Sequence, residues 1–292
     1  MVTDDTQMEA QSIDGEIARY LRTGESDPYC AAWPGAVVER VAAARADLRE
    51  ALAREVRRLA QAGSASALPD VDIAAHTRRK VAPMVRGLFS RAEQEVVLEL
   101  LERSVVFVTS ETIGPLIAEA SWNGSAWDLA NLYLASVDAP LLGDDAPALV
   151  GISEETTCYV SVAYFDDDDP FADFIVHEAA HIFHNCKRGS AGLKQTHTRE
   201  WLLDIEYTKR ETFAYACEVY ARILERGTRP AERIALAAEF AKRQDAPDDR
   251  VDPQELAHIV SAAASARNGW KRIYARCAKG AGRGAGGASG AG

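Results

Sequence analysis

Apolar residues recur at helical spacing in several long stretches of the chain. Between positions 37 and 61, Val38, Val41 and Leu48 belong to an apolar series that is separated by Ala, Arg and Glu, the pattern of an amphipathic helix. The same periodicity predicts further helices over residues 91–103, 127–137, 202–226, 231–243 and 253–277. A β-branched run at 104–109 predicts a strand, and 148–152 with 157–165 predict two strands of a hairpin.

Polar residues, glycine and proline mark the ends of these predicted helices and strands. Asn123-Gly124 predicts a turn, and the aspartates at 166–169 followed by Pro170 predict the start of a helix. The pattern indicates an α+β fold that is mainly helical and has a small β-sheet. We expect a helical N-terminal region over 1–103, a second folded domain over 104–279, and a disordered tail of Gly, Ala and Ser over 280–292.

Composition narrows the functional classes. The chain has 292 residues and a formal charge of -11, which argues against nucleic acid as a partner because phosphate binding needs clustered cations. No apolar run approaches the ~20 residues that cross a bilayer as a helix, so no membrane partner is expected.

The N-terminus lacks the pattern of a secretory signal. Five widely spaced cysteines without a Cys-x-x-Cys pair predict free thiols in the cytoplasm. The oligomeric state does not follow from the sequence.

The apolar segment 174–184 carries the strongest chemical signal. His177 and His181 are four residues apart, so their imidazoles share one face of a helix and can bind one metal ion. Glu178 projects beside that face, where it can accept a proton from an activated water without binding the metal. The spacing therefore predicts a metal site with an adjacent general base.

This segment resembles the active-site helix of the zincin metallopeptidases, through the motif His177-Glu178-x-x-His181 and through the strand, helix, connection and helix of residues 157–226. The long metzincin signature would need a histidine where Lys187 stands, and no Gly-Thr-x-x-Asp sequence follows. The resemblance therefore implies the gluzincin branch, in which Zn²⁺ takes its third ligand from a glutamate on a later helix.

Two glutamates match that expectation. Glu211 is preferred because it is nearer the connection from the first helix, and Glu218 lies seven residues later on nearly the same helical face. If Glu211 binds the metal, Glu218 is expected to accept a hydrogen bond from a ligand imidazole. Tyr207 and Tyr215, each about one turn from Glu211, and His197 in the preceding connection are candidate oxyanion stabilisers.

The resemblance implies a zinc metallopeptidase that hydrolyses peptide bonds of a selective intracellular protein substrate. It also implies that the strand containing Tyr159 and Ser161 can act as a sheet edge and pair with an extended peptide. Two alternatives stay open at this point. The chain could be a catalytically silent zincin scaffold that binds or regulates a partner, or a metal-free helical module in which His177 and His181 are core residues.

Overall fold

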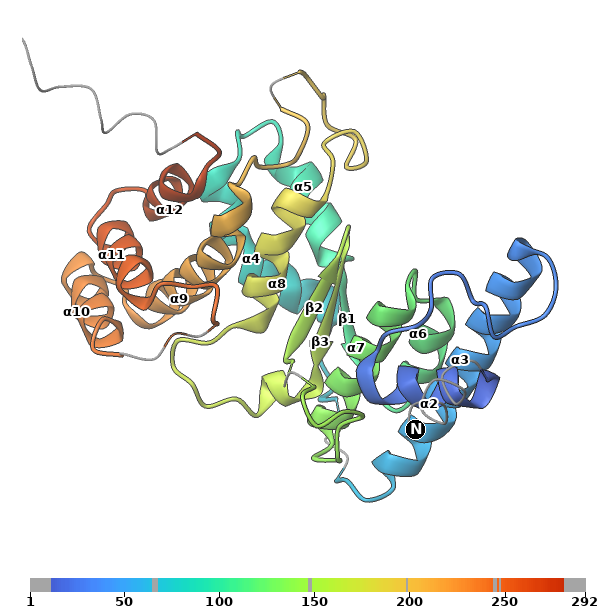
Figure 1. Cartoon of the computed structure of the whole chain (residues 1–292). Helices are drawn as coiled ribbons and strands as arrows, with labels where there is room; N and C mark the ends of the chain where they lie inside the picture. The colour runs from blue at the N-terminus through green and yellow to red at the C-terminus, as the bar shows by residue number, and fades with distance from the viewer. Residues whose placement is uncertain are drawn as a thin grey trace, which may run out of the picture. The chain divides into compact units, whose positions relative to one another are not determined.

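The computed structural model describes residues 12–64, 68–146, 149–197, 199–243, 246 and 248–280. Helices predominate and three short strands form one sheet (Figure 1), so the predicted mainly helical α+β fold is confirmed. Within those residues, every helix is too short or too polar to traverse a bilayer. All but the first residue of the predicted tail lies outside the described residues.

The helices follow one another along the chain, with one strand after α5 and two strands between α7 and α8. In order they are α2 (Ile13–Thr23), α3 (Val37–Ala60), α4 (Ile73–Leu88), α5 (Gln94–Glu102), α6 (Ile113–Glu119), α7 (Asn123–Ser136), α8 (Phe174–Asn185), α9 (Arg210–Arg226), α10 (Pro230–Phe240), α11 (Pro253–Ala264) and α12 (Gly269–Cys277). The 3₁₀ turn η1 (Val162–Phe165) follows β3 and precedes the connection to α8. The 3₁₀ turn η2 (Tyr207–Lys209) leads directly into α9.

The sheet contains β1 (Val105–Val108), β2 (Gly151–Glu154) and β3 (Thr157–Ser161) in the order β1-β3-β2. The predicted hairpin is confirmed: β2 and β3 are neighbours joined by two residues, and the first of these, Glu155, has a φ of 43°. Because β3 has a partner on both sides, the expectation that this strand offers a free edge is wrong. Among the described residues, β1 and β2 are the outer strands of the sheet.

The chain folds into two compact units that do not coincide with the boundary predicted at 103/104. Unit 1 comprises Met1–Pro69, Phe107–Ile152 and Tyr159–Asp166, and unit 2 comprises Asp70–Val106, Ser153–Cys158 and Asp167–Gly292. Helices α4 and α5, expected in the N-terminal region, thus belong to the same unit as α8 to α12. The chain passes between the units several times, which a pattern along the sequence cannot reveal.

Unit 1 packs α3 against α7, with α2 and α6 beside them. Leu48 and Leu52 of α3 and Leu132 of α7 are fully buried in its core. Arg49, which is itself buried, donates to the carbonyl oxygens of Ile117 and Ala118 at 2.8 and 2.9 Å, so it satisfies the end of α6.

Unit 2 is built around α8. Every residue from 175 to 184 is buried, and α8 packs against α9 and α4. Its Phe183 contacts Phe89 edge to face, with ring centroids 5.1 Å apart. Gly87 in α4 allows Trp270 of α12 to approach, because a Cβ at position 87 would lie 2.2 Å from the indole Cδ1. Helix α8 is therefore packed between α4, which precedes it in the sequence, and α9, which follows it.

Helix α8 begins later than predicted. Asp169 accepts a hydrogen bond from the N–H of Phe171 at 2.8 Å and forms an ion pair with Arg243, so the acidic run forms a turn and not a helix cap. The cap is Asp173, whose carboxylate accepts from the N–H of Val176 at 3.3 Å.

Helix α9 is also shorter than the predicted 202–226. The backbone before it pairs with the C-terminal segment: the N–H of Glu206 donates to the carbonyl of Cys277 at 2.8 Å, and that of Lys279 donates to Asp204 at 3.0 Å. These long-range hydrogen bonds keep residues 204–206 extended, and they join two segments that the sequence gives no reason to pair.

Two further boundaries differ. Helix α7 begins at Asn123, so the Asn-Gly pair predicted as a turn forms its first residues. The predicted helix 253–277 is interrupted between α11 and α12, where the Asn268 side chain accepts from the N–H of Lys271 at 3.2 Å. Gly269 is required there, because a Cβ would lie 2.3 Å from Cζ of Tyr220.

Candidate metal centre

The start of α8 is fixed by a buried carboxylate. Asp173 is 1% exposed, and besides capping the helix its Oδ2 lies 2.9 Å from Nζ of Lys80 on α4. Its backbone N–H donates to Oε1 of Glu218 on α9 at 2.8 Å. Three helices thus meet at the residue that sets the register of α8, and the two motif histidines follow one and two turns later.

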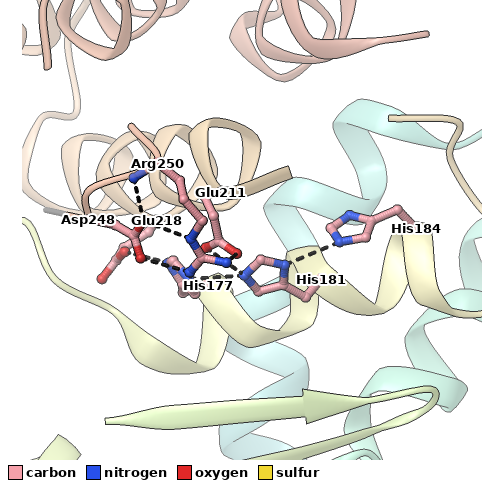
Figure 2. Close-up of polar contacts among 7 residues, drawn as sticks. All are labelled: His177, His181, His184, Glu211, Glu218, Asp248 and Arg250. Carbon is pink, nitrogen blue, oxygen red and sulfur yellow. Dashed lines mark hydrogen bonds and ion pairs between the residues drawn. The ribbon is translucent and has the colours of Figure 1, made fainter. Parts of the chain in front are cut away.

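The side chains of His177, His181 and Glu211 converge at one point (Figure 2). The Nε2 atoms of the two imidazoles are 3.1 Å apart, and Oε2 of Glu211 lies 3.3 Å from Nε2 of His181 and 3.8 Å from Nε2 of His177. Both histidines are buried. Two nitrogen donors and one carboxylate oxygen in this arrangement could hold a metal ion.

Glu218 lies behind His177 and not among the converging donors. Its Oε2 is 2.9 Å from Nδ1 of His177, while its Oε1 binds the backbone of Asp173. Of the two glutamates left open by the sequence, Glu211 therefore faces the Nε2 atoms and Glu218 holds the far side of one imidazole. Carboxylates in this second position orient ligand imidazoles in metalloproteins.

A guanidinium holds the remaining oxygen of Glu211. Nη1 of Arg250, from the loop between α10 and α11, lies 3.0 Å from Oε1 of Glu211 (Figure 2). The same side chain binds Asp248 through Nε and Nη2 at 2.8 and 2.7 Å. The carboxylate is therefore directed with Oε1 toward the loop and Oε2 toward the imidazoles.

Glu178 is buried beside the converging donors and is 5% exposed. Burial raises the pKa of its carboxyl and the charge of Glu211 adds to this, against the opposing effects of the two imidazoles and a hydrogen bond from Ser153. A carboxylate in such surroundings is a stronger base than an exposed one. Ser153 belongs to the edge strand β2.

The surroundings of His177 favour positive charge. Burial opposes its charged form, but the hydrogen bond and charge of Glu218, with the charges of Glu178 and Glu211, raise its pKa to about 9. Burial also opposes ionisation of Glu211, yet His181, His177 and Arg250 lower its pKa. A group of carboxylates that attracts a proton to a buried imidazole also attracts a metal cation.

Of the three candidate oxyanion stabilisers, Tyr215 contacts a motif histidine, whereas Tyr207 and His197 are exposed. The ring of Tyr215 packs against that of His177 with centroids 4.4 Å apart, and burial raises the pKa of its phenol, so the hydroxyl stays protonated. Tyr207 is 76% exposed and its ring lies under the guanidinium of Arg210. His197 is exposed, and within the described ranges the structure records no contact between it and the converging donors.

The sequence did not reveal four of the supporting groups. Lys80, Ser153, Asp248 and Arg250 lie in polar or irregular stretches and follow no recognisable spacing from the motif. Each reaches the site only through tertiary contacts. In contrast, the four-residue spacing of His177 and His181 was sufficient to predict that their side chains lie close together.

No protein-family model matches this sequence, and the searches of curated proteins and of solved structures likewise return no match. A functional assignment therefore depends on the residues and geometry described above.

Replacing Asp173 with alanine is expected to destabilise the protein by more than about 1 kcal/mol, because a lost N-cap costs about 1 kcal/mol and the buried contact with Lys80, which keeps Glu225 as its other partner, is lost as well. Asp173→Asn keeps a cap acceptor and should have an intermediate effect. The matched control is Asp252→Ala, which removes an exposed cap that accepts from the N–H of Gln254 at 2.9 Å. Urea unfolding measures all three, and equal losses for Asp173→Ala and Asp252→Ala would contradict the anchoring role of Asp173.

Proposed function

We propose that this chain is a zinc-dependent metallopeptidase whose ligands are His177, His181 and Glu211. The observation that supports the proposal most strongly is the convergence of three donor atoms from α8 and α9 beside the buried carboxyl of Glu178.

The spacing of the donors fits zinc. Tetrahedral zinc with bonds of about 2.0–2.2 Å to nitrogen and oxygen separates its ligand atoms by about 3.3–3.5 Å. The three donor separations here are 3.1, 3.3 and 3.8 Å. Two imidazoles and one carboxylate are also the donor set of catalytic zinc sites, which leave one position for water or substrate.

In such a set, zinc supplies a Lewis acid that acidifies a water molecule and polarises a substrate carbonyl. Glu178 then serves as the general base and acid: it accepts the proton of the attacking water and delivers it to the leaving amine. Glu218 and Arg250 keep His177 and Glu211 in position during these transfers. Tyr215 is the phenol best placed to donate a hydrogen bond to the developing oxyanion.

Two features support a peptide as the substrate. A cavity of about 630 Å³ is lined by apolar side chains that include Phe171, Phe174 and Leu256, and by the charged Asp169, Lys242 and Arg243. Its wall also contains Tyr215 and Glu218, which contact His177. A cavity of this size can take a large apolar side chain. The edge strand β2 carries Ser153, the partner of Glu178, so an extended peptide paired with that edge would lie near the general base.

The proposal includes a cytoplasmic location and a selective protein substrate. All five cysteines are unpaired and buried, as expected in a reducing compartment. Selectivity would come from binding energy away from the cleaved bond. Unit 1 provides none of the ligand or catalytic residues named above, and we assign such recognition to it.

The first test is the metal itself. The protein is expected to bind one zinc ion per chain, and removal by a chelator should lower the melting temperature because the ion binds only the folded state. Glu211→Ala should lower zinc affinity more than about 100-fold, whereas Glu218→Gln should lower it about 10–100-fold, as loss of a supporting carboxylate does. Elemental analysis and chelator competition measure these changes.

Glu239→Ala is the control for the zinc measurements, because Glu239 lies on α10 and its side chain is 53% exposed. Protein that is purified under zinc-replete conditions and holds no stoichiometric metal would overturn the proposal. Equal losses for Glu211→Ala and Glu239→Ala would remove Glu211 from the ligand set.

The second test separates binding from catalysis. Glu178→Gln keeps the size of the side chain and removes its basicity, so the variant should retain zinc and lose about 10²–10⁴-fold in hydrolysis. Peptides derived from a cell lysate, with new N-termini identified by mass spectrometry, provide the substrate. Undiminished cleavage by Glu178→Gln would exclude it as the base, and a zinc-loaded wild type that cleaves neither peptides nor intact lysate proteins would favour the silent-scaffold alternative.

A further inference from the structure

The third histidine of α8 contacts the metal-facing pair. Nε2 of His184 lies 3.2 Å from Nδ1 of His181, and the two rings meet edge to face with centroids 5.1 Å apart (Figure 2). Residues three apart share a helix face, and His184 is 3% exposed. The contact is thus a buried hydrogen bond in which one ring donates and the other accepts.

The direction of this hydrogen bond follows from the site. Nε2 of His181 faces Nε2 of His177 and the carboxylate of Glu211. An imidazole that binds a metal through Nε2 keeps its hydrogen on Nδ1. Nδ1 of His181 is then the donor, and Nε2 of His184 must carry no hydrogen in order to accept.

We propose that His184 is a positioning residue of the metal centre: it accepts the hydrogen bond from Nδ1 of His181 and so fixes the tautomer and ring orientation in which His181 binds the metal. This inference rests on the proposed zinc site. It gives the two ligand histidines different supports, because His177 is held by the carboxylate of Glu218 and His181 by an uncharged ring.

A histidine in the last turn of a helix often has a simpler role, since its cationic form interacts favourably with the C-terminal end of the helix dipole. That role requires hydrogens on both ring nitrogens. Here an N–H at Nε2 of His184 would point at the N–H of His181 across 3.2 Å. The contact with His181 therefore favours the neutral ring with its hydrogen on Nδ1, a buried atom that has no hydrogen-bond partner among the described residues.

The tautomer can be read directly in the zinc-loaded wild-type protein. Long-range ¹H–¹⁵N correlation spectra distinguish protonated from unprotonated ring nitrogens, and we expect His184 to be neutral with its hydrogen on Nδ1. A hydrogen on Nε2 of His184 in protein that holds stoichiometric zinc would overturn the positioning role alone. Protein that takes up no zinc would overturn the metal centre as well, and metal content separates the two results.

Variants test the consequence for binding. His184→Leu removes the acceptor and should lower zinc affinity about 10–100-fold, whereas His184→Gln offers a carbonyl oxygen in its place and should restore most of that loss. Asn185→Ala, the next residue on α8, is the control. Melting of each metal-free variant reports whether the fold is intact, and equal zinc affinities for wild type, His184→Leu and His184→Gln would contradict the proposal.

Discussion

The burial of α8 is the constraint on which the rest of the site depends. Between positions 175 and 184 this helix places three histidines and a glutamate inside a packed unit, where each polar group loses water and needs a partner. Unpartnered, each such group would cost about 1–3 kcal/mol. The observed partners come from α9, from β2 and from α8 itself. The packing of unit 2 therefore also assembles the site.

The consequence is a centre in which each candidate ligand is held by a second group. Glu218 supports His177, His184 supports His181, and Arg250 supports Glu211. Such supports keep the donor atoms close to a tetrahedral spacing before any cation arrives, which reduces the reorganisation that binding requires. Glu211 and Glu218 lie on nearly the same face of α9, yet Glu211 faces the Nε2 atoms and Glu218 contacts Nδ1 of His177.

The sequence predicted the parts of this site that depend on local periodicity. His177 and His181 lie on the same face of α8, as predicted, because residues four apart share a face in any α-helix. The sequence pattern placed the start of α8 too early. Asp169 accepts a hydrogen bond from the N–H of Phe171 in a turn and forms an ion pair with Arg243, so it does not cap the helix. The interleaved units, the central position of β3 and the guanidinium near Glu211 all arise from contacts between distant segments, which no local pattern records.

The central claim is that α8 and α9 together hold a zinc ion through two imidazoles and one carboxylate. X-ray absorption at the zinc edge of the purified protein tests it most directly, because it reports the atoms bound to the metal without reference to activity. The account predicts nitrogen and oxygen neighbours at about 2.0–2.2 Å with the multiple-scattering signature of two imidazoles. A first shell that contains sulfur at about 2.3 Å, or one without imidazole scattering, would contradict it.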